Sequence, residues 1–169
     1  MIPHYKNIHN RFKINGIHLD KEAVFVFSYS LIKEGDAFEK ELGNFLLDWF
    51  DDKETIELTT SGTTGTPKNI TINKQSMVHS AIATADFFDL HPQDKALLCL
   101  PPRYIAGKMM IVRALIIGLE LDILTPSSHL DDLEIDKKYD FVAIVPLQAE
   151  NSLAKLHQFK KIIVGGAKV

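Results

Sequence analysis

The segment 59–68, which reads TTSGTTGTPK, constrains the fold of this chain more than any other stretch. Apolar and polar residues alternate just before it, over 56–60, and again just after it, over 70–72. Such alternation is typical of half-buried strands. The sequence therefore predicts two strands joined by a loop rich in glycine and hydroxyl groups.

This loop carries several groups that bind anions. Gly62 and Gly65 permit a positive φ and a close approach of the backbone to a ligand. Pro67 fixes the direction in which the chain leaves the loop, and Lys68 adds a positive charge. Four hydroxyl side chains stand among them: Ser61, Thr63, Thr64 and Thr66. A concave set of such donors suits a polyphosphate.

The spacing of the glycines differs from that of the P-loop of kinases and GTPases. A P-loop has four residues between its glycines and continues into a helix. Here two residues separate Gly62 from Gly65, and a strand pattern follows. A flexible Ser/Thr/Gly linker is the plainer alternative. The flanking strand patterns and the Pro-Lys exit do not suit a linker.

The segment resembles the signature loop of the adenylate-forming superfamily, which includes acyl-CoA synthetases, luciferases and peptide-synthetase adenylation domains. That pattern is roughly Thr-Ser-Gly-Thr-Thr-Gly-x-Pro-Lys-Gly, and only Asn69 departs from it. The segment 100–107 is similar to the family's Leu-Pro-Leu-aromatic-His-x-x-Gly. Here Arg103 stands at the aromatic position, Tyr104 at the histidine and Gly107 at the glycine.

Two further stretches add to the resemblance in the same register. The segment 145–148, VPLQ, looks like a helix entrance of the family, and 165–167, GGA, matches its Gly-Gly-Ala. Within the superfamily, the short lead-in and the run 100–114 look most like the o-succinylbenzoate–CoA ligases of menaquinone synthesis.

The resemblance implies an acid–CoA ligase, which uses ATP and Mg²⁺ to make an acyl adenylate and then transfers the acyl group to CoA. The carboxylic acid, ATP and CoA would be its partners. The residues implied at the nucleotide are Thr60, Ser61, Gly62, Thr63, Thr64, Gly65, Thr66, Lys68, Gly165, Gly166 and Ala167. By the same resemblance, Ser61, Thr63, Thr64 and Lys68 would hold the β- and γ-phosphates. Arg103, Tyr104 and Gly107 would border the acid pocket.

Composition narrows the other possibilities. The chain has 169 residues, enough for one domain with a real core. Its 19 basic and 22 acidic residues give no surface suited to nucleic acid. Cys99 is the single cysteine, which excludes an internal disulfide and suits a cytoplasmic protein. The most apolar stretch, 109–119, is too short for a membrane span and contains Arg113. The N-terminal histidines fit no metal-ligand spacing, so we expect no metal site from them.

The alternation of helix and strand patterns predicts an α/β fold, the N-terminal subdomain portion of the adenylate-forming enzymes, with a largely parallel sheet flanked by helices. Asp36 and Glu39 predict a capping box at the start of a helix over 36–50, whose aromatic stripe should pack on the sheet. Other helices are expected over 73–88 and 108–117. Strands are expected over 23–27, 95–100, 119–124, 139–145 and 160–164.

Family members continue for hundreds of residues, so we expect residues 1–169 to be a partial N-terminal, AMP-binding domain. The catalytic lysine, the magnesium and ribose ligands and the C-terminal domain would then lie beyond Val169, and the fragment alone would be inactive. A homo-oligomer remains open. Three alternatives also remain: a non-catalytic nucleotide-binding domain, an unrelated anion-binding α/β module, and a different acyl- or aryl-CoA ligase.

Overall fold

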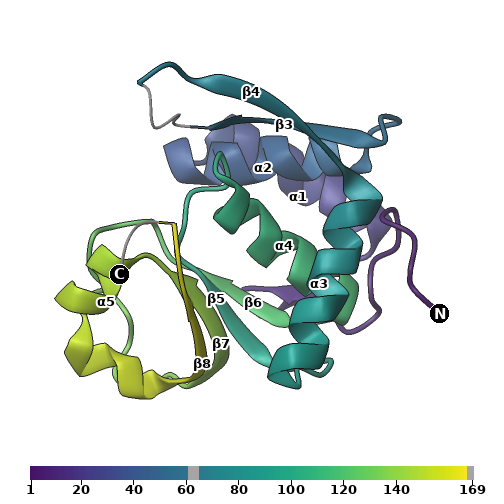
Figure 1. The fold of residues 1–169 in the computed structure, drawn as a ribbon. Helices are drawn as coiled ribbons and strands as arrows, with labels where there is room; N and C mark the ends of the chain where they lie inside the picture. The colour runs from purple at the N-terminus through teal and green to yellow at the C-terminus, as the bar shows by residue number, and fades with distance from the viewer. Residues whose placement is uncertain (61–64, 167–169) are drawn as a thin grey trace.

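The structure, a computed structural model, describes residues 1–60 and 65–166. The strands are β1 (Lys13–Ile14), β2 (Ile17–His18), β3 (Thr55–Thr60), β4 (Lys68–Asn73), β5 (Lys95–Leu98), β6 (Glu120–Ile123), β7 (Tyr139–Ile144) and β8 (Phe159–Val164). The helices are α1 (Lys21–Glu34), α2 (Ala37–Phe50), α3 (Lys74–Phe88), α4 (Ile105–Ile117), α5 (Pro146–Asn151) and the 3₁₀ helix η1 (Leu153–Gln158). Figure 1 shows their arrangement.

The main sheet has six strands in the order β2–β1–β6–β5–β7–β8. Only β2 runs antiparallel to its neighbour, and every other adjacent pair is parallel. The predicted largely parallel sheet flanked by helices is thus confirmed. The strands β3 and β4 form a separate antiparallel hairpin.

Neighbouring strand residues enter two different hydrophobic clusters, one on each face of the sheet. Leu98 and Ala143 belong to the cluster that contains α3 and α4, whereas Leu97 and Val142 belong to the cluster under α5 and η1. Successive side chains of a strand point to opposite faces, and this divides the core. The sheet is therefore covered on both sides, as parallel sheets are.

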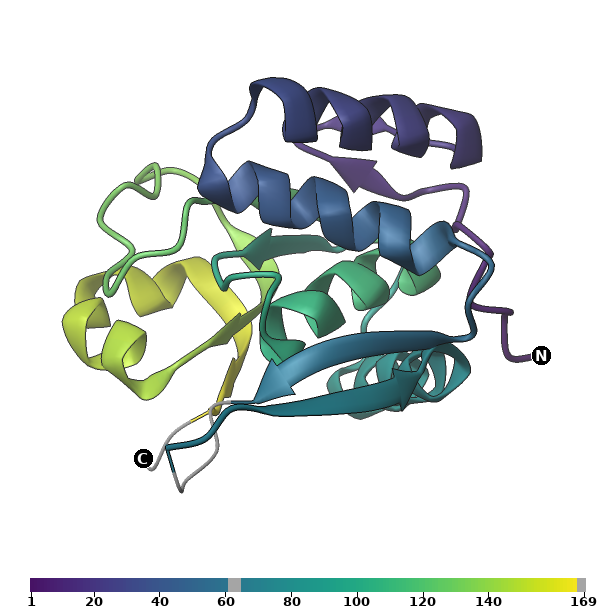
Figure 2. The same cartoon turned by 90° about the horizontal axis from the view of Figure 1, so that it is seen from above.

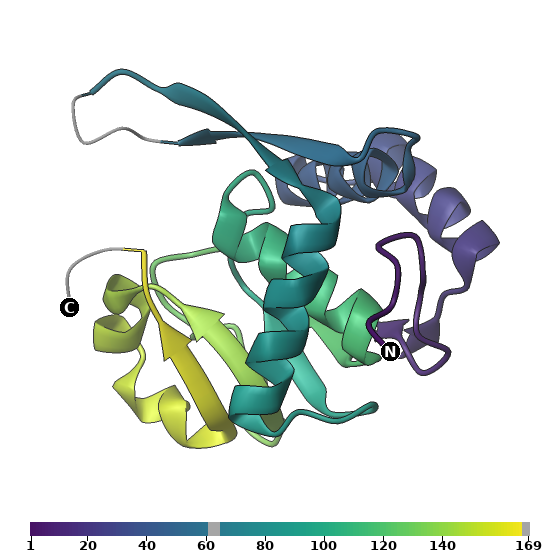
Figure 3. The ribbon, with the colours of Figure 1, turned by 45° about the vertical axis from the view of Figure 1, so that its right-hand side comes forward.

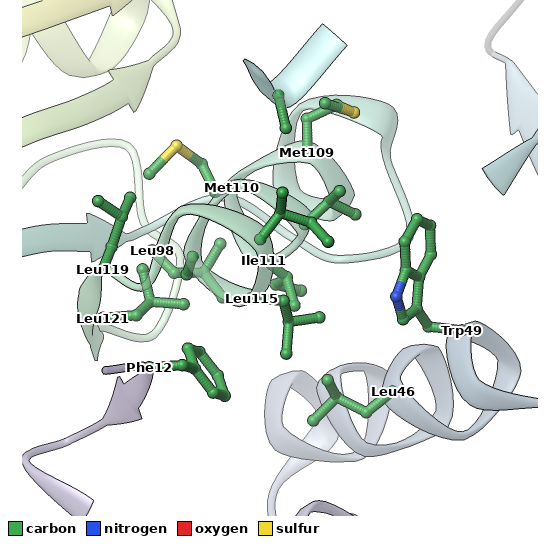
Figure 4. Packing of buried hydrophobic residues seen from close by; sticks show 14 of the residues in the cluster. Phe12, Leu46, Trp49, Leu98, Met109, Met110, Ile111, Leu115, Leu119 and Leu121 are labelled. Atoms are coloured by element: carbon green, nitrogen blue, oxygen red, sulfur yellow. The ribbon is translucent and has the colours of Figure 1, made fainter. Parts of the chain in front are cut away.

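The helix α4 is the centre of the larger cluster. Ten of its side chains or glycine positions are buried, on all sides of the helix, and Arg113 is only half-buried. A helix that is apolar all round must be surrounded by other elements. Figure 4 shows α4 between Leu98 and Leu121 of the sheet and Leu46 and Trp49 of α2.

The helix α2 begins as the sequence predicts. The Asp36 carboxylate accepts a hydrogen bond from the Glu39 N–H at 2.8 Å, and the Glu39 carboxylate accepts one from the Asp36 N–H at 2.9 Å. Its aromatic stripe is buried, but α4 lies between that stripe and the strands. The stripe packs over the sheet through α4, because the apolar surface of α4 already covers the strands.

The strand predicted over 23–27 is wrong, because these residues lie within the helix α1. The Asp20 carboxylate caps the helix by accepting the Ala23 N–H at 2.8 Å, and only Val24 and Ser28 are buried. A short apolar run does not by itself distinguish a strand from a helix. Here the cap and the contact of α1 with α2, visible in Figure 2, decide for a helix.

No helix of the described residues combines the length and the apolar character needed to cross a bilayer.

Candidate functional site

The carboxyl ends of the parallel strands β5, β7 and β8 meet at one edge of the sheet. Loops that follow parallel strands gather at this edge, and it is where open α/β sheets bind ligands. The segment 100–104 follows β5, Val145 follows β7, and Gly165 and Gly166 follow β8. Three of the four sequence segments that carry the family resemblance therefore begin at the same edge through the topology of the sheet.

A cavity of about 610 Å³ lies at this edge and is lined mainly by apolar groups. Its walls include Thr60 from the hairpin, Leu100 and Tyr104 after β5, Val145 and Gly166. Among the described residues on the walls, the only basic side chain is that of Arg103, and none is acidic. Such a lining suits a ligand with an apolar body and a few polar atoms.

The hairpin contributes Leu58, Thr59 and Thr60 to this cavity. Thr60 pairs with Lys68 across the hairpin, and its hydroxyl donates to the Lys68 carbonyl at 3.3 Å. The Thr59 hydroxyl donates to the Asn69 side-chain oxygen at 3.1 Å, so the residue that departs from the family pattern helps to close the hairpin. Figure 3 shows the hairpin reaching beyond α4, toward the side of the molecule that carries β8.

The remaining loop residues divide into two groups. Gly65 has a φ of +79°, the left-handed conformation that glycine permits, and Thr66 and Lys68 are exposed. These three do not line the cavity. Ser61, Gly62, Thr63, Thr64 and Ala167 lie outside the described residues, so their predicted positions remain predictions.

The second predicted group is Arg103, Tyr104 and Gly107, of which the first two form part of the rim of the cavity. Arg103 and Tyr104 line it, and the Arg103 guanidinium stacks over the Tyr104 ring at 5.0 Å. Arg103 is also paired with Glu41 of α2, with 2.9 Å between Nη1 and Oε1. Hydrogen bonds with Tyr104 and Glu41 raise the pKa of Arg103, so it stays charged at any physiological pH.

Gly107 does not line the cavity but permits the rim to form. A Cβ at this position would collide with the Pro101 carbonyl oxygen and would lie 2.9 Å from that of Leu100. The first turn of α4 can therefore approach the loop after β5 only without a side chain. Gly165 likewise lies near the cavity without lining it, and its N–H donates to the Ile144 carbonyl at 3.1 Å.

Gln148 and Cys99 both line the cavity, and both side chains are buried. Gln148 is 2% exposed, and its amide donates to the carbonyls of Cys99 and Ser127, both at 3.0 Å. It also accepts the Val145 N–H at 3.1 Å, so it ties three loops together. Burial raises the pKa of the Cys99 thiol to about 12, which keeps the thiol protonated.

Arg113, to which the sequence motifs assign no role, has an unusual environment. Burial lowers the pKa of Arg113 to about 10, and its guanidinium lies over the Phe141 ring at 5.8 Å. Its Nε is buried and has no hydrogen-bond partner among the described residues. The one sequence feature that pointed to Arg113 was its position in an otherwise apolar segment. What surrounds it could not be inferred from the sequence.

The described residues suit a polyphosphate better than a metal ion. Hydroxyls, backbone N–H groups and the Lys68 amine donate hydrogen bonds, which phosphate oxygens accept. Among residues 1–60 and 65–166, no three His, Cys, Asp or Glu side chains gather as metal ligands.

Comparisons with known proteins identify a family for the chain. The family of AMP-binding enzymes matches residues 55–168. The chain is 28% identical over 150 residues to the 2-succinylbenzoate–CoA ligase of Listeria monocytogenes, covering 82% of the chain and 31% of that protein. It is 30% identical over 129 residues to the probable 2-succinylbenzoate–CoA ligase of Mycobacterium tuberculosis, covering 69% of the chain and 33% of that protein.

Among solved structures, the chain is similar to an acyl-CoA synthetase (AMP-forming)/AMP-acid ligase II-like protein from Dyadobacter fermentans. The TM-score is 0.73 and the identity 31%, over 85% of this chain and 43% of that one. The chain thus spans between about a quarter and a third of the length of the curated relatives it matches.

Proposed function

Because the chain belongs to the AMP-binding enzyme family, the adenylate-forming superfamily, we propose that it is the N-terminal part of an acid–CoA ligase. The ligase would join a carboxylic acid to ATP, forming an acyl adenylate and pyrophosphate, and would then pass the acyl group to CoA. One observation carries the proposal. A single, mostly apolar cavity is lined by the hairpin, by the segment after β5 and by Gly166.

The chemistry needs an activating step because a carboxylate has no good leaving group. Attack of the carboxylate on the α-phosphate of ATP provides one, and the negative charge builds on phosphate oxygens. Catalysis by this chain would be mainly positioning and electrostatic stabilisation. In this proposal Ser61, Thr63, Thr64 and Lys68 hold the β- and γ-phosphates, with Thr60 and Thr66 shaping the loop. Magnesium would neutralise part of the triphosphate charge.

We propose o-succinylbenzoate as the acid, which would place the ligase in menaquinone synthesis. We also propose that the ligase is cytoplasmic. The names of the curated relatives support this choice. The acid carries a second carboxylate, and an arginine is the side chain best suited to pair with it. Arg103 lines the cavity but is already paired with Glu41. Arg113 does not line it, and its buried Nε has no hydrogen-bond partner among the described residues.

A different acyl- or aryl-CoA ligase is the second candidate. The pairing of Arg103 with Glu41 favours it. Because Glu41 already neutralises the charge of Arg103, the otherwise apolar cavity has no unpaired positive charge for a second carboxylate among its described lining residues. The two candidates differ in what happens when the arginines are replaced.

The first experiment expresses the chain with the reading frame that follows it, and also alone, and supplies ATP, Mg²⁺ and o-succinylbenzoate. We expect the longer protein to release AMP and pyrophosphate, and to form the CoA thioester when CoA is added. The chain alone should do neither, and should bind ATP no tighter than about millimolar, about −4 kcal/mol. Absence of turnover by the longer protein on a panel of aromatic and aliphatic acids would contradict the proposal.

The second experiment compares Arg103→Leu and Arg113→Met on o-succinylbenzoate and on benzoate. At least one variant should lose a bidentate ion pair between its guanidinium and the second carboxylate. We expect that variant to lose tenfold or more in kcat/KM on the dicarboxylate, with benzoate within twofold of wild type. Equal losses on both acids in both variants would remove o-succinylbenzoate and favour the second candidate.

A further inference from the structure

The hairpin β3–β4 is attached to the rest of the molecule mainly at its base. Its described residues pair with no strand of the main sheet. Ile56 and Leu58 of β3 are buried, whereas every residue of β4 except Ile72 is exposed. Figure 3 shows it extending past α3 and α4. The position of its far end, where Thr60 and Lys68 pair, therefore depends on how the base is held.

One residue holds both ends of that base. The Lys74 side chain is fully buried, and its Nζ donates to Asp51 Oδ1 at 2.8 Å. The Lys74 backbone N–H donates to the Glu54 carbonyl at 2.8 Å. Asp51 ends α2 and Glu54 precedes β3, whereas Lys74 is the first residue of α3, directly after β4. Lys74 thus links the segment before the hairpin to the helix after it.

The N-terminal segment closes over this link. The Lys74 ammonium lies 5.4 Å from the centre of the Tyr5 ring, a cation–π contact. Tyr5 is held in turn, because its carbonyl accepts the Trp49 indole N–H at 2.9 Å and its N–H donates to the Gln75 side chain at 3.0 Å. The buried ammonium is therefore compensated by one carboxylate and one aromatic face.

A neighbouring ion pair shows what this arrangement adds. Asp52, next to Asp51 in the chain, pairs with Lys6 at 3.4 Å, but the Asp52 side chain is fully exposed. Exposed pairs contribute little, whereas breaking a buried pair leaves an uncompensated charge. Of the two aspartates, only Asp51 holds a residue that belongs to the base of the hairpin.

We propose that Lys74 and Asp51 form a clasp that fixes the angle of the hairpin over the cavity. The clasp would make Lys74 a positioning residue for the phosphate-binding loop, acting through Thr60 and Lys68 without touching the nucleotide. The structural part of this inference stands on the described contacts alone. Its consequence for ATP rests on the proposed function.

Distance measurements between spin labels test the structural part on the chain as it is. Labels at Thr71 on β4 and Glu150 on α5, both exposed, report the hairpin angle, and labels at Asp86 on α3 and Glu150 report the body of the molecule. In Lys74→Met, which keeps the packing volume and removes the charge, we expect the Thr71–Glu150 distribution to broaden at least twofold. The Asp86–Glu150 distribution should stay as in wild type.

Asp52→Asn is the matched control for Asp51→Asn, and only the latter should behave like Lys74→Met. The fluorescence of Trp49, the single tryptophan, checks that local packing survives in each variant. An unchanged Thr71–Glu150 distribution in Lys74→Met would overturn the clasp. Equal broadening of both label pairs would also overturn it, since the residue would then hold the whole molecule and not the hairpin angle.

Steady-state kinetics of the longer protein tests the consequence. Lys74→Met should raise KM for ATP at least fivefold and leave KM for the acid within twofold, a split that general loss of stability does not produce. Equal changes in both KM values would overturn the positioning role. If the unsubstituted protein makes no adenylate at all, the proposed function fails, while the distance measurements still decide the clasp.

Discussion

Single residues at the cavity show how surroundings limit chemistry. Cys99 lines the cavity, but burial raises the pKa of its thiol to about 12, so it cannot serve as a nucleophile near neutral pH. Gln148, by contrast, forms hydrogen bonds through its amide with three backbone groups and so connects three loops. Lys68 at the start of β4 is exposed, which leaves its charge available to a phosphate.

Replacing Lys68 by alanine should therefore slow adenylation in the longer protein about ten- to a thousandfold, ~1.4–4 kcal/mol in the barrier. Its charge would matter more as pyrophosphate forms than in the ground state. ATP–pyrophosphate exchange is the measurement, with Lys33→Ala near the end of α1 as the control, because Lys33 is exposed. Exchange at the wild-type rate in Lys68→Ala would rule out this role.

Among the elements, α4 depends most on how it ends. Gly118 terminates it with a φ of +87°, and the ring of His9 packs where a Cβ would be. The backbone N–H of His9 also donates to the Leu115 carbonyl at 2.8 Å, which ties the N-terminal segment to the last turn of the helix. The end of α4 is thus shaped by a segment that lies far from it in the sequence.

Gly118→Ala should destabilise the chain by roughly 1–3 kcal/mol, because an alanine is strained at positive φ and would also meet His9. Urea unfolding measures this. Gly16→Ala is the matched control, since Gly16 has a φ of +78° and no atom within 4 Å of the place that a Cβ would take. If Gly118→Ala lowers the free energy of unfolding no more than Gly16→Ala does, the contact with His9 has no destabilising effect.

On the scale of the whole molecule, the sheet separates two clusters and carries the cavity at one edge, while charged groups join the strands at the opposite edge. Asp140 at the start of β7 accepts the Lys95 N–H at 2.8 Å and pairs with Lys160 at 2.9 Å. It thereby connects β5, β7 and β8. Burial alone would raise the pKa of Asp140, but the hydrogen bonds from Lys95 and Lys160 and the charges of Lys160 and Lys161 outweigh it and lower the pKa.

A carboxyl whose pKa is lower in the folded state stabilises the fold above its unfolded pKa, near 3.8. That contribution is lost as the pH falls through the folded pKa. We therefore expect the free energy of unfolding to fall as the pH is lowered below about 4, and to fall less steeply in Asp140→Asn. Urea titrations from pH 5 to about 2 measure the slopes, with exposed Asp86→Asn as the control. Identical slopes in Asp140→Asn and wild type would contradict the expectation.

Much of the fold and part of the candidate site could be predicted from local patterns. The capping box at Asp36, the alternation on each side of the segment 59–68, and the apolar runs of β5 and β7 act over a few residues, so short-range stereochemistry determines them. The same holds for the glycine-rich segment, whose composition and flanking strand patterns together predict an anion-binding loop.

Only the tertiary structure decided the rest. The run 23–27 is part of a helix because α1 packs against α2, in addition to the local cap at Asp20. The strand β1 joined the sheet beside β6, which lies far away in the sequence. Likewise, Lys74 became a buried clasp, Arg103 found Glu41, and Arg113 was left without a carboxylate partner among the described residues. Burial and pairing depend on which distant elements meet, because the free energy of a side chain is set by its final neighbours and not by its neighbours in sequence.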